Sequence, residues 1–452
     1  MRPSALLSVA VSGLLLVAAS AATRPHYGGS LRASTTEAIS SLDPATDDSI
    51  WRRNLTGLLF DTLVTVDDRD RILPALATAW RVDPGNQRCT LVLRPQIHFH
   101  DGSLVTPDSV AASLRTANPS WKIYATPDSV VIERSSPSPT LLAELSESRN
   151  AIAKRNNANS ATGTGPFKID SWTPGKQLTV VANDDYWNGR PFVDSIQLTM
   201  GVPANDLERG IELGRVDATT LLPNQVHPAG ANSYQVLASP VCELIALVFA
   251  HEPQSPGEAT IREALNLAID RTSIRNVLLE GSGEPTASLL PNWMTGYAFV
   301  FQPAFNLATA RERRASTSAT ARLSLGYDAT DPIARTLAER VALNAQDAGI
   351  LLRTSTAPAP DVRLVRILLS SPDPRVALPH LAEQLGVAMP AQTLQSEQDL
   401  YQAENDILRK NVVIPIVFLP VRYATASSVQ DWRVTRLGVW RPESIWLAGP
   451  IP

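Results

Sequence analysis

The sequence predicts a mixed α/β protein built from several short sheets flanked by helices. Between residues 28 and 245, short apolar runs with the alternation of strands are separated by turns; further along, apolar residues recur more often at helical spacing. The chain has 452 residues, 44% of them apolar, which is enough for a large core and, at roughly 150 residues per domain, for about three structural units. Its 35 prolines lie mostly between these segments, where proline marks turns and helix starts.

The strands expected in the first half alternate with turns and two helices. A helix over residues 54–63 has four leucines on one face. Residues 73–80 form a further apolar turn, and His100-Asp101-Gly102 is the turn that ends a hairpin. A second helix begins after Thr106, because Thr is a favoured N-cap and Pro107 suits the first helical position. The expected strands are residues 31–34, 90–93, 130–132, 178–181 and 196–200.

The second half is more helical. Apolar residues of 261–269 follow the i, i+4, i+7, i+8 pattern of one helix face, and Asp331-Pro332 opens another helix that ends at Gly349. Pro415 favours an edge position for the strand that contains it. Further helices are expected at residues 273–279 and 400–410, and further strands at 350–352 and 412–419.

The first 22 residues have the pattern of a secretory signal peptide. Arg2 gives a positive start, residues 6–19 are apolar, and Ala19-Ser20-Ala21 is a small-residue cleavage site. The apolar stretch is shorter than the roughly 20 residues that span a bilayer, which disfavours the alternative of a membrane anchor. With no Cys near the cleavage site, we expect a soluble periplasmic protein and not a lipoprotein.

Composition and cysteine usage exclude several classes of protein. The net charge is −4, with no Lys/Arg run long enough to follow a phosphate backbone, so nucleic acid is not an expected partner. Cys89 and Cys242 are the only cysteines, too few for a structural zinc site. They could pair in an oxidising compartment, but each lies in an apolar run of a different expected domain, and we favour two buried free thiols.

Catalytic and metal-binding motifs are missing from the sequence. There is no G-x-S-x-G, H-E-x-x-H, S-x-x-K or P-loop motif. His98 and His100 share one face of a strand, but a metal site needs three or four ligands, and we interpret this pair as a hairpin end. We therefore expect no enzyme and no cofactor; a secreted hydrolase, with nucleophile, base and orienting group in one cleft, is the alternative of another class.

One long, ordered string identifies a family resemblance. It runs from Gly163 as G-T-G-P-F-K-I, through Trp172 and Pro174-Gly175, to N-D-D-Y-W-N-G-R-P-F-V-D at residues 183–194. The string resembles the extracellular solute-binding proteins of family 5, the peptide- and nickel-binding group of bacterial ABC importers. The resemblance covers residues 28–285 and is patchy beyond; other blocks that match in order lie at residues 41–44, 58–63, 73–80, 93–110 and 261–271.

The resemblance implies a periplasmic-binding-protein-like (type II) fold with two lobes that close by a hinge over the ligand, plus an extra inserted domain. The implied division is a signal peptide (1–21), a discontinuous first domain (28–45, 162–240 and 412–450), an inserted second domain (46–161) and a shortened third domain (241–411). It also implies capture of a peptide or related small solute between the lobes by a monomeric protein, which presents the solute to a permease and ATPase complex in the inner membrane.

The resemblance also points to site residues. Peptide binders of the family hold the ligand amino group with an Asp, and Ser370 stands at that position here, with Ile367 in place of an upstream aromatic residue. Ser supplies no opposite charge for a buried ammonium, so we expect that free peptides are not held in the usual way. Further candidates for ligand contact, for which a solvated loop is the alternative, are Asp48, Ser49 and Ile50, together with Arg366 and Trp293.

Two other functions within the same fold stay open. The chain is either an importer component or an altered member that delivers its ligand to a sensor. A nickel complex is an alternative ligand, and with only six His in the chain the metal would have to arrive already chelated.

Overall fold

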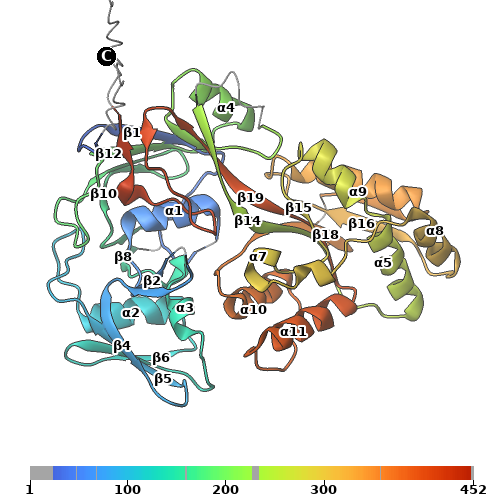
Figure 1. Cartoon of the computed structure of the whole chain (residues 1–452), viewed down its shortest axis with the longest axis horizontal. Helices are drawn as coiled ribbons and strands as arrows, with labels where there is room; N and C mark the ends of the chain where they lie inside the picture. The colour runs from blue at the N-terminus through green and yellow to red at the C-terminus, as the bar shows by residue number, and fades with distance from the viewer. Residues whose placement is uncertain are drawn as a thin grey trace, which may run out of the picture.

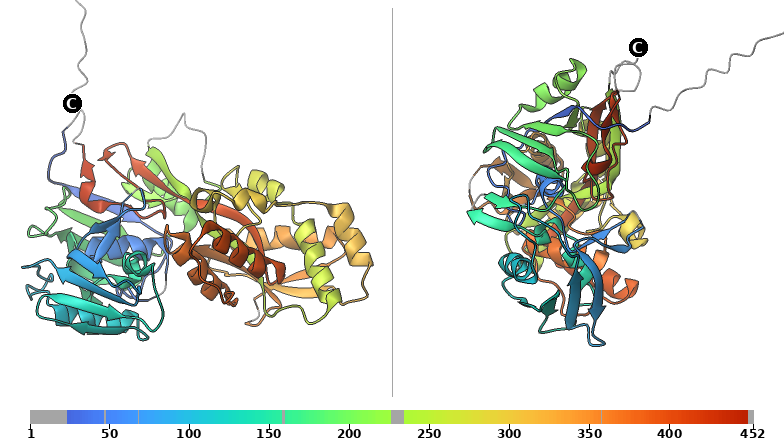
Figure 2. Two further views of the ribbon diagram at one scale, coloured as in Figure 1. Left: turned by 60° about the horizontal axis from the view of Figure 1, so that its bottom comes forward. Right: turned by 90° about the vertical axis from the view of Figure 1, so that its left-hand side faces the viewer.

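The computed structural model describes residues 24–46, 48–67, 69–157, 160–225, 234–356 and 358–448, so the expected signal peptide lies outside the described residues. The chain forms two lobes that lie side by side along the long axis and are joined by two long strands (Figures 1 and 2). Within these ranges, no helix is both long and apolar enough to cross a membrane.

One mixed sheet of eleven strands extends through both lobes. Its order is β10-β11-β12-β1-β13-β19-β14-β18-β16-β17, with β15 paired to β19. The strands, in chain order, are β1 (Ser30–Ser34), β10 (Phe167–Thr173), β11 (Gln177–Ala182), β12 (Ser195–Thr199), β13 (Ala218–Thr220), β14 (Tyr234–Phe249), β15 (Glu284–Pro285), β16 (Arg322–Gly326), β17 (Leu351–Ser355), β18 (Val362–Leu368) and β19 (Val413–Ala426).

The antiparallel pair β14 and β19 passes from one lobe into the other (Figure 1). Their register shifts three times, at Ala238/Val241, Val241/Glu243 and Ile245/Ala246. The expectation of an edge strand at Pro415 is wrong, since β19 lies between β14 and β13 and its middle also pairs with β15. Pro415 is tolerated because it lies beside the last of these shifts and before the residues that pair with β15.

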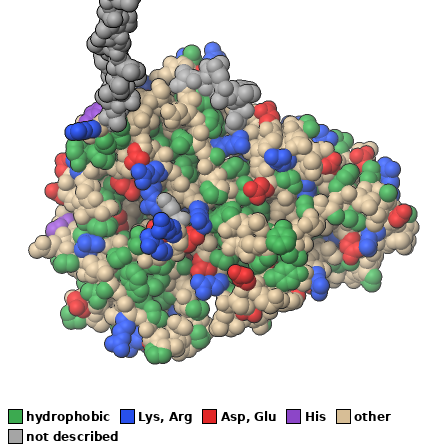
Figure 3. Space-filling view, viewed as in Figure 1, with side chains coloured by type: hydrophobic (Ala, Val, Ile, Leu, Met, Phe, Trp, Pro, Cys, Tyr) green, Lys and Arg blue, Asp and Glu red, His purple; other side chains and the backbone are tan. Residues whose placement is uncertain are grey.

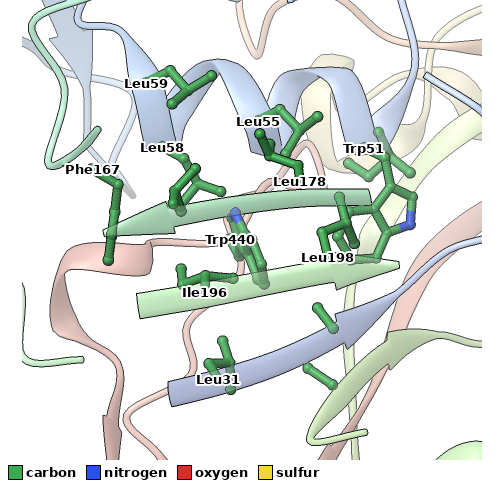
Figure 4. Close-up of a cluster of buried hydrophobic side chains, with 14 of the residues drawn as sticks. Leu31, Trp51, Leu55, Leu58, Leu59, Phe167, Leu178, Ile196, Leu198 and Trp440 are labelled. Carbon is green, nitrogen blue, oxygen red and sulfur yellow. The ribbon is translucent and has the colours of Figure 1, made fainter. Parts of the chain in front are cut away.

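Helix α1 (Ile50–Leu59) covers the sheet of the first lobe. It begins four residues before the expected start because the Ser49 side chain caps it, accepting a hydrogen bond from the Arg52 amide. Figure 4 shows the buried face of α1 above β11 and β12. The apolar residues at this contact are Trp51, Leu55, Leu58, Leu178, Ile196, Leu198 and Trp440. The expected 54–63 helix therefore ends too late, and Leu63 belongs to a different core.

A small separate sheet, ordered β4-β5-β7-β6, forms the lower part of the first lobe in Figure 1. Its core also contains residues of α2 (Pro107–Ala117) and α3 (Leu141–Leu145). The expected start of α2 is confirmed, as Thr106 and Ser109 form a capping box. Residues 73–80, expected as an apolar turn, instead supply strands. The strands of this region are β2 (Val64–Val66), β3 (Ile72–Pro74), β4 (Ala77–Val82), β5 (Arg88–Leu93), β6 (Lys122–Ala125), β7 (Ser129–Glu133), β8 (Lys154–Asn157) and β9 (Ser160–Thr162).

The second lobe consists of the residues expected as the third domain, and that name is kept here. Helices cover both faces of the sheet in this domain. Alternate residues of β14 face opposite cores: Ile245 and Leu247 pack with α5, α8 and α9, whereas Leu244 and Ala246 pack with α10 and α11. The single helix expected at residues 273–279 is instead two short helices in succession, the second of which is a π-helix. The helices are α5 (Pro256–Ala268), α6 (Arg271–Ser273), η2 (Ile274–Leu278), α7 (Asn292–Thr295), η3 (Ala298–Val300), α8 (Leu307–Ala315), α9 (Ala334–Asp347), α10 (Pro374–Leu385) and α11 (Glu397–Arg409).

The remaining elements cover the first lobe near the crossing strands: α4 (Ala204–Glu212), β20 (Val429–Gln430), η4 (Pro442–Ser444) and β21 (Trp446–Leu447). We propose the domain division stated above with one change. Residues 413–419 of β19 pack in the cores of the third domain, and Val421 is the first apolar residue of β19 in the core of the first lobe. The chain therefore returns to the first domain near residue 420, and not at residue 412.

Both cysteines are buried free thiols, as expected. Cys89 belongs to the core of the small sheet and Cys242 to the core of the first lobe. Burial raises the pKa of Cys89 to about 11 and that of Cys242 to about 12. Neither thiol is therefore ionised appreciably at neutral pH.

Side chains from the string that carries the family resemblance donate hydrogen bonds to Asp61. This buried carboxylate accepts hydrogen bonds from Thr164 Oγ1 (2.7 Å), Tyr186 Oη (2.8 Å) and Trp187 Nε1 (3.1 Å). Burial, opposed by these three bonds, raises the pKa of Asp61 to about 6. The string thus ties the end of α1 to the hairpin of β10 and β11.

Two glycines of the same string lie directly against the last turn of α1. A Cβ on Gly163 would lie 1.8 Å from the Leu59 carbonyl oxygen, and one on Gly165 would lie 2.5 Å from the Leu59 carbonyl carbon. Only glycine permits this backbone approach.

We expect Gly165→Ala to lower the free energy of unfolding by about 3 kcal/mol, because the added methyl group meets backbone that has no room to move. Urea denaturation measures this change. Gly57→Ala is the matched control: a Cβ there meets nothing within 4 Å, and in a helix Ala is favoured over Gly by about 1 kcal/mol. Equal effects of the two substitutions would contradict the close approach at Gly165.

Candidate functional site

A cavity of about 720 Å³, here called the main cleft, lies between the first lobe and the third domain. One wall is formed by the residues around the start of α1, the other by β18 and the loop that precedes α9, and Pro420–Arg422 of β19 close it. Four of the expected site residues line the main cleft, namely Asp48, Ser49, Ile50 and Arg366. The structure thus brings together segments that lie more than 300 residues apart in the chain.

Ser49 and Ile50 have structural roles at the wall of the main cleft. Besides capping α1, the Ser49 hydroxyl donates to Glu37 Oε2 (2.5 Å). Burial raises the pKa of Glu37 in spite of that bond. Ile50 is 9% exposed and packs in the core of the first lobe. Both residues therefore fix the position of this wall.

Asp48 holds an arginine that links the two lobes. Arg53 Nε donates to Asp48 Oδ1 (2.7 Å), its Nη2 pairs with the other carboxylate oxygen, and its Nη1 donates to the Leu369 carbonyl (2.6 Å). Although burial opposes its charge, Asp48 raises the pKa of Arg53 above its ordinary value. Arg53 was not among the predicted site residues, although a charged residue beside the leucines of an amphipathic helix was an available signal.

We expect Asp48→Asn to lower the free energy of unfolding by about 2 kcal/mol, because it leaves the guanidinium of Arg53 without its counter-charge. The loss stays below that of a fully buried pair, since the Asp48 side chain is 37% exposed. Chemical denaturation checks this. Glu339→Gln, which removes an exposed ion pair with Arg335, should change stability by less than about 0.5 kcal/mol. If Asp48→Asn changed the free energy of unfolding by as little as Glu339→Gln does, the proposed role of Asp48 would be contradicted.

Arg366 is held by acidic groups on its side of the sheet. Its Nε and Nη2 donate to Glu243 Oε2 (3.1 and 2.6 Å), and its Nη1 lies 3.6 Å from Asp331 Oδ2. Burial lowers the pKa of Arg366, but these two carboxylates outweigh it and raise the pKa overall. Its charge is therefore already balanced within the protein.

Three expected residues, Ile367, Trp293 and Ser370, lie outside the main cleft. Ile367 is 8% exposed and packs with α10 and α11, because successive residues of a strand face opposite sides of the sheet and Arg366 takes the cleft side. Trp293 donates its Nε1 to the Val241 carbonyl (2.8 Å) and lines a separate cavity of about 530 Å³ beside Pro372.

Ser370 lines a second cavity of about 260 Å³, here called the inner cavity, which shares Asp48 with the main cleft. Ser370 Oγ lies 3.0 Å from His380 Nδ1, and Glu147 Oε1 lies 3.1 Å from the same nitrogen. A hydrolytic triad needs the serine on one ring nitrogen and the carboxylate on the other. This arrangement of serine, histidine and carboxylate therefore does not support hydrolysis.

The histidines of the hairpin belong to the scaffold. The ring of His100 contacts the Gly165 carbonyl through Nε2 (3.0 Å), and Gly102 adopts the turn that was expected, with φ +81°. Among the residues that the structure describes, no group of three or more His, Cys, Asp and Glu side chains is placed to hold a metal ion.

His380 of the third domain and Glu147 of the small-sheet region form an ion pair across the lobes. The Glu147 carboxylate raises the pKa of His380 above its ordinary value, against burial and against Arg149, with a smaller raising effect from Glu144. A raised folded-state pKa means that the pair stabilises the fold fully below the unfolded value of 6.5, and that this contribution is lost as pH rises through the folded value.

We expect His380→Gln to lower the free energy of unfolding by about 1.5 kcal/mol at pH 5.5 and by clearly less at pH 9, because only the protonated ring pairs with Glu147. Denaturation at both pH values measures the difference. His98→Gln, at an exposed histidine, is the control and should show no such dependence. A loss at pH 9 as large as at pH 5.5 would show that only the neutral hydrogen bond to Ser370 matters.

Two lobes joined by crossing strands, with a cavity between them, give the chain the fold of the type II periplasmic binding proteins. The family model of the bacterial extracellular solute-binding proteins, family 5 Middle, matches residues 71–363, and the chain belongs to this family. Members of this family are solute-binding proteins found outside the cytoplasm.

Several characterised proteins are similar to this chain. The nickel-binding protein NikA of Staphylococcus aureus is 25% identical over 243 residues, which is 50% of this chain and 49% of that protein. The oligopeptide-binding protein AppA of Bacillus subtilis is 26% identical over 129 residues, 28% of this chain and 24% of that protein. The chain spans about half the length, or less, of the first curated relatives that it matches.

Solved structures share the fold over nearly the whole chain. The periplasmic binding protein DppA of Helicobacter pylori, in complex with the peptide STSA, has a TM-score of 0.83 at 18% identity and covers 94% of this chain and 99% of that one. Staphylococcus aureus NikA, in complex with Ni(L-His)2, has a TM-score of 0.77 at 19% identity and covers 92% and 98%.

Proposed function

We propose that this chain is the periplasmic substrate-binding protein of an ABC importer. It captures a peptide or related small solute between its lobes and presents it to the permease and ATPase complex of the inner membrane. The observation that supports this proposal is the main cleft, whose volume of about 720 Å³ suits a small solute and whose walls belong to different lobes.

Lobe closure supplies the transport signal in this proposal. Two of the three register shifts in the β14–β19 ladder, at Ala238/Val241 and Val241/Glu243, lie where the strands leave the first lobe, so bending there costs few backbone hydrogen bonds. The solute is buried when the lobes close, and the importer distinguishes the closed form from the open form. No chemical step is required, in keeping with a protein that is not an enzyme.

Location and assembly follow from the same proposal. The signal peptide directs the chain to the periplasm, where it acts as a soluble monomer without a lipid anchor. On the face shown in Figure 3, basic and acidic side chains are interspersed over both lobes, a distribution that does not favour nucleic acid as a partner.

A nickel complex is the second candidate for the solute. The similarity to NikA of Staphylococcus aureus, whose structure holds Ni(L-His)2, favours it. The metal would arrive with its own ligands, so the protein would need to recognise only the outer surface of the complex.

Native mass spectrometry of protein purified from a bacterial periplasm, compared with the same protein denatured and refolded, tests the proposed function. We expect a discrete added mass that is lost on refolding and that identifies the co-purified solute. Ala329→Trp, which places an indole in the main cleft, should abolish the added mass, whereas Leu343→Trp on the exposed face of α9 should not.

The absence of any added mass, together with no thermal shift across peptide and nickel-complex libraries, would contradict the proposal. That result would favour the altered member of the fold that serves a sensor. An added mass that persists in Ala329→Trp would place the solute outside the main cleft.

A further inference from the structure

His380 and Glu147 form a titratable pair at the contact between the lobes. Glu147 lies just before the short helix η1 (Ser148–Asn150) of the first lobe, and His380 lies on α10, which faces the region of α3 (Figure 1). Nδ1 of His380 is 3.1 Å from Glu147 Oε1, and both residues line the inner cavity. Movement of one lobe away from the other therefore breaks this pair.

The carboxylate of Glu147 depends on the histidine for its counter-charge. Its side chain is 4% exposed, and among the residues that the structure describes no other cationic group lies within ion-pair distance of it. Neither of its oxygens accepts a hydrogen bond from any other described residue. When His380 loses its proton, the closed arrangement buries a carboxylate without an opposite charge, which is unfavourable. Separation of the lobes returns this carboxylate to water.

The charged groups around the pair do not replace the histidine. Arg53 is already bound to Asp48 and to the Leu369 carbonyl. Arg149 is exposed and donates to the Ala117 carbonyl (3.2 Å). Arg149 lowers the pKa of His380 and Glu144 raises it, so these two neighbours oppose each other. The other charged side chains that line the inner cavity or bind one that does are Arg52, Asp43, Arg155 and Glu383.

Other polar contacts between the lobes use arginine. Arg53 reaches the Leu369 carbonyl, and the guanidinium of Arg436 lies 5.5 Å from the centroid of the Trp293 ring. A guanidinium stays charged across the whole range of pH in which proteins are folded, whereas a histidine changes its charge near neutral pH. The contact between His380 and Glu147 is therefore the one of these three that responds to pH.

We propose that protonation of His380 regulates lobe closure, so that the closed form is favoured in acid and loses stability as the pH rises. On closing, the ring takes up one proton from the solvent and pairs with Glu147; on opening, it releases that proton. This regulation rests on the proposed function and makes solute capture depend on the proton concentration.

The direction of the effect follows from the pair itself. Glu147 raises the pKa of His380 in the closed form, whereas a solvated ring in the open form keeps the ordinary value of 6.5. The pair therefore stabilises the closed form fully below 6.5, and this contribution is lost as the pH rises through the raised value.

Asp61 and Glu404 titrate in the same range of pH, but each lies within one lobe. Asp61, whose pKa is about 6, has its hydrogen-bond donors in the first lobe. Glu404, whose pKa burial raises to about 7, accepts hydrogen bonds from the amides of Leu289 and Leu290 in the third domain. Both carboxylates remain in a variant at His380, so a comparison with the wild type removes their contribution.

Small-angle X-ray scattering of the full mature chain, refolded to remove any solute, measures lobe separation through the radius of gyration. We expect the wild-type radius to increase by about 1 Å between pH 5.5 and pH 9, as the lobes separate. His380→Lys keeps a cation beside Glu147 at pH 9 and should hold the smaller radius at both pH values. Glu383→Gln, at an exposed carboxylate of the same helix, is the control and should show the wild-type increase.

Two neutral substitutions should give opposite results. His380→Gln removes the counter-charge, so the lobes should stay apart at both pH values. Glu147→Gln removes the charge that needs a counter-charge, so the radius should stay small at both pH values. Glu147→Gln also serves as the test variant if His380→Gln folds poorly.

Native mass spectrometry connects closure with capture. The probe is the mass that co-purifies with the chain from the periplasm. We expect the wild-type protein to retain this mass at least about threefold less at pH 9 than at pH 5.5, because the closed form is weakened. His380→Lys should retain it equally at both pH values.

Two outcomes would overturn the inference: a wild-type radius that is the same at pH 5.5 and pH 9, or an equal increase in His380→Gln, Glu147→Gln and the wild type. If a co-purified mass is still found, either result leaves the proposed function in place. A pH-dependent radius that is lost in both variants, without any co-purified mass, would support the effect of His380 on closure and contradict the proposed function.

Discussion

The pairing of β14 with β19 is the constraint on which the rest of the structure depends. The two strands belong to the sheet of both lobes, so each strand contributes residues to the core of the first lobe and to the cores of the third domain. A change in register along one strand would exchange its inward and outward side chains in both lobes at once. Two of the register shifts, near Ala238 and Glu243, lie at the crossing, and the third, at Ile245/Ala246, lies just inside the third domain.

Two of the contacts between the lobes differ in kind from the packing within them. Inside each lobe the cores are apolar, whereas Arg53 with Asp48 and the Leu369 carbonyl, and Glu147 with His380, are charged or polar pairs. Such contacts are directional and can be exchanged with water or a ligand at little net cost in free energy. An apolar seam of the same size would hold the lobes together permanently. The polar boundary is what suits a protein that must open as well as close.

The sequence predicted the elements with strong local signals and the order of the family blocks. The capping of α2 by Thr106 is confirmed, and the five strands expected in the first half correspond to β1, β5, β7, β11 and β12, because capping and alternation are local properties. The other strands of that half were not predicted. Asp48, Ser49, Ile50 and Arg366 were placed near a pocket by the resemblance, and they do line the main cleft. The start of α1 was missed because the cap at Ser49 was not recognised. Arg53, Glu147 and His380 were missed because their partners are distant in the chain, by 316 residues for Arg53 and Leu369. Ile367 was expected in the site, but it lies on the face of β18 opposite to Arg366 and packs in an apolar core.

The two buried thiols have a practical consequence. Since Cys89 and Cys242 lie in separate cores and keep their protons at neutral pH, neither offers a thiolate for exchange or alkylation while the protein stays folded. The two thiols therefore do not respond to the redox state of the surroundings while the protein stays folded. For the same reason, the native cysteines need not be removed before site-directed labelling. If one surface cysteine were introduced in each lobe, only these two would react with a dye or spin label. The distance between the two labels would then measure the separation of the lobes.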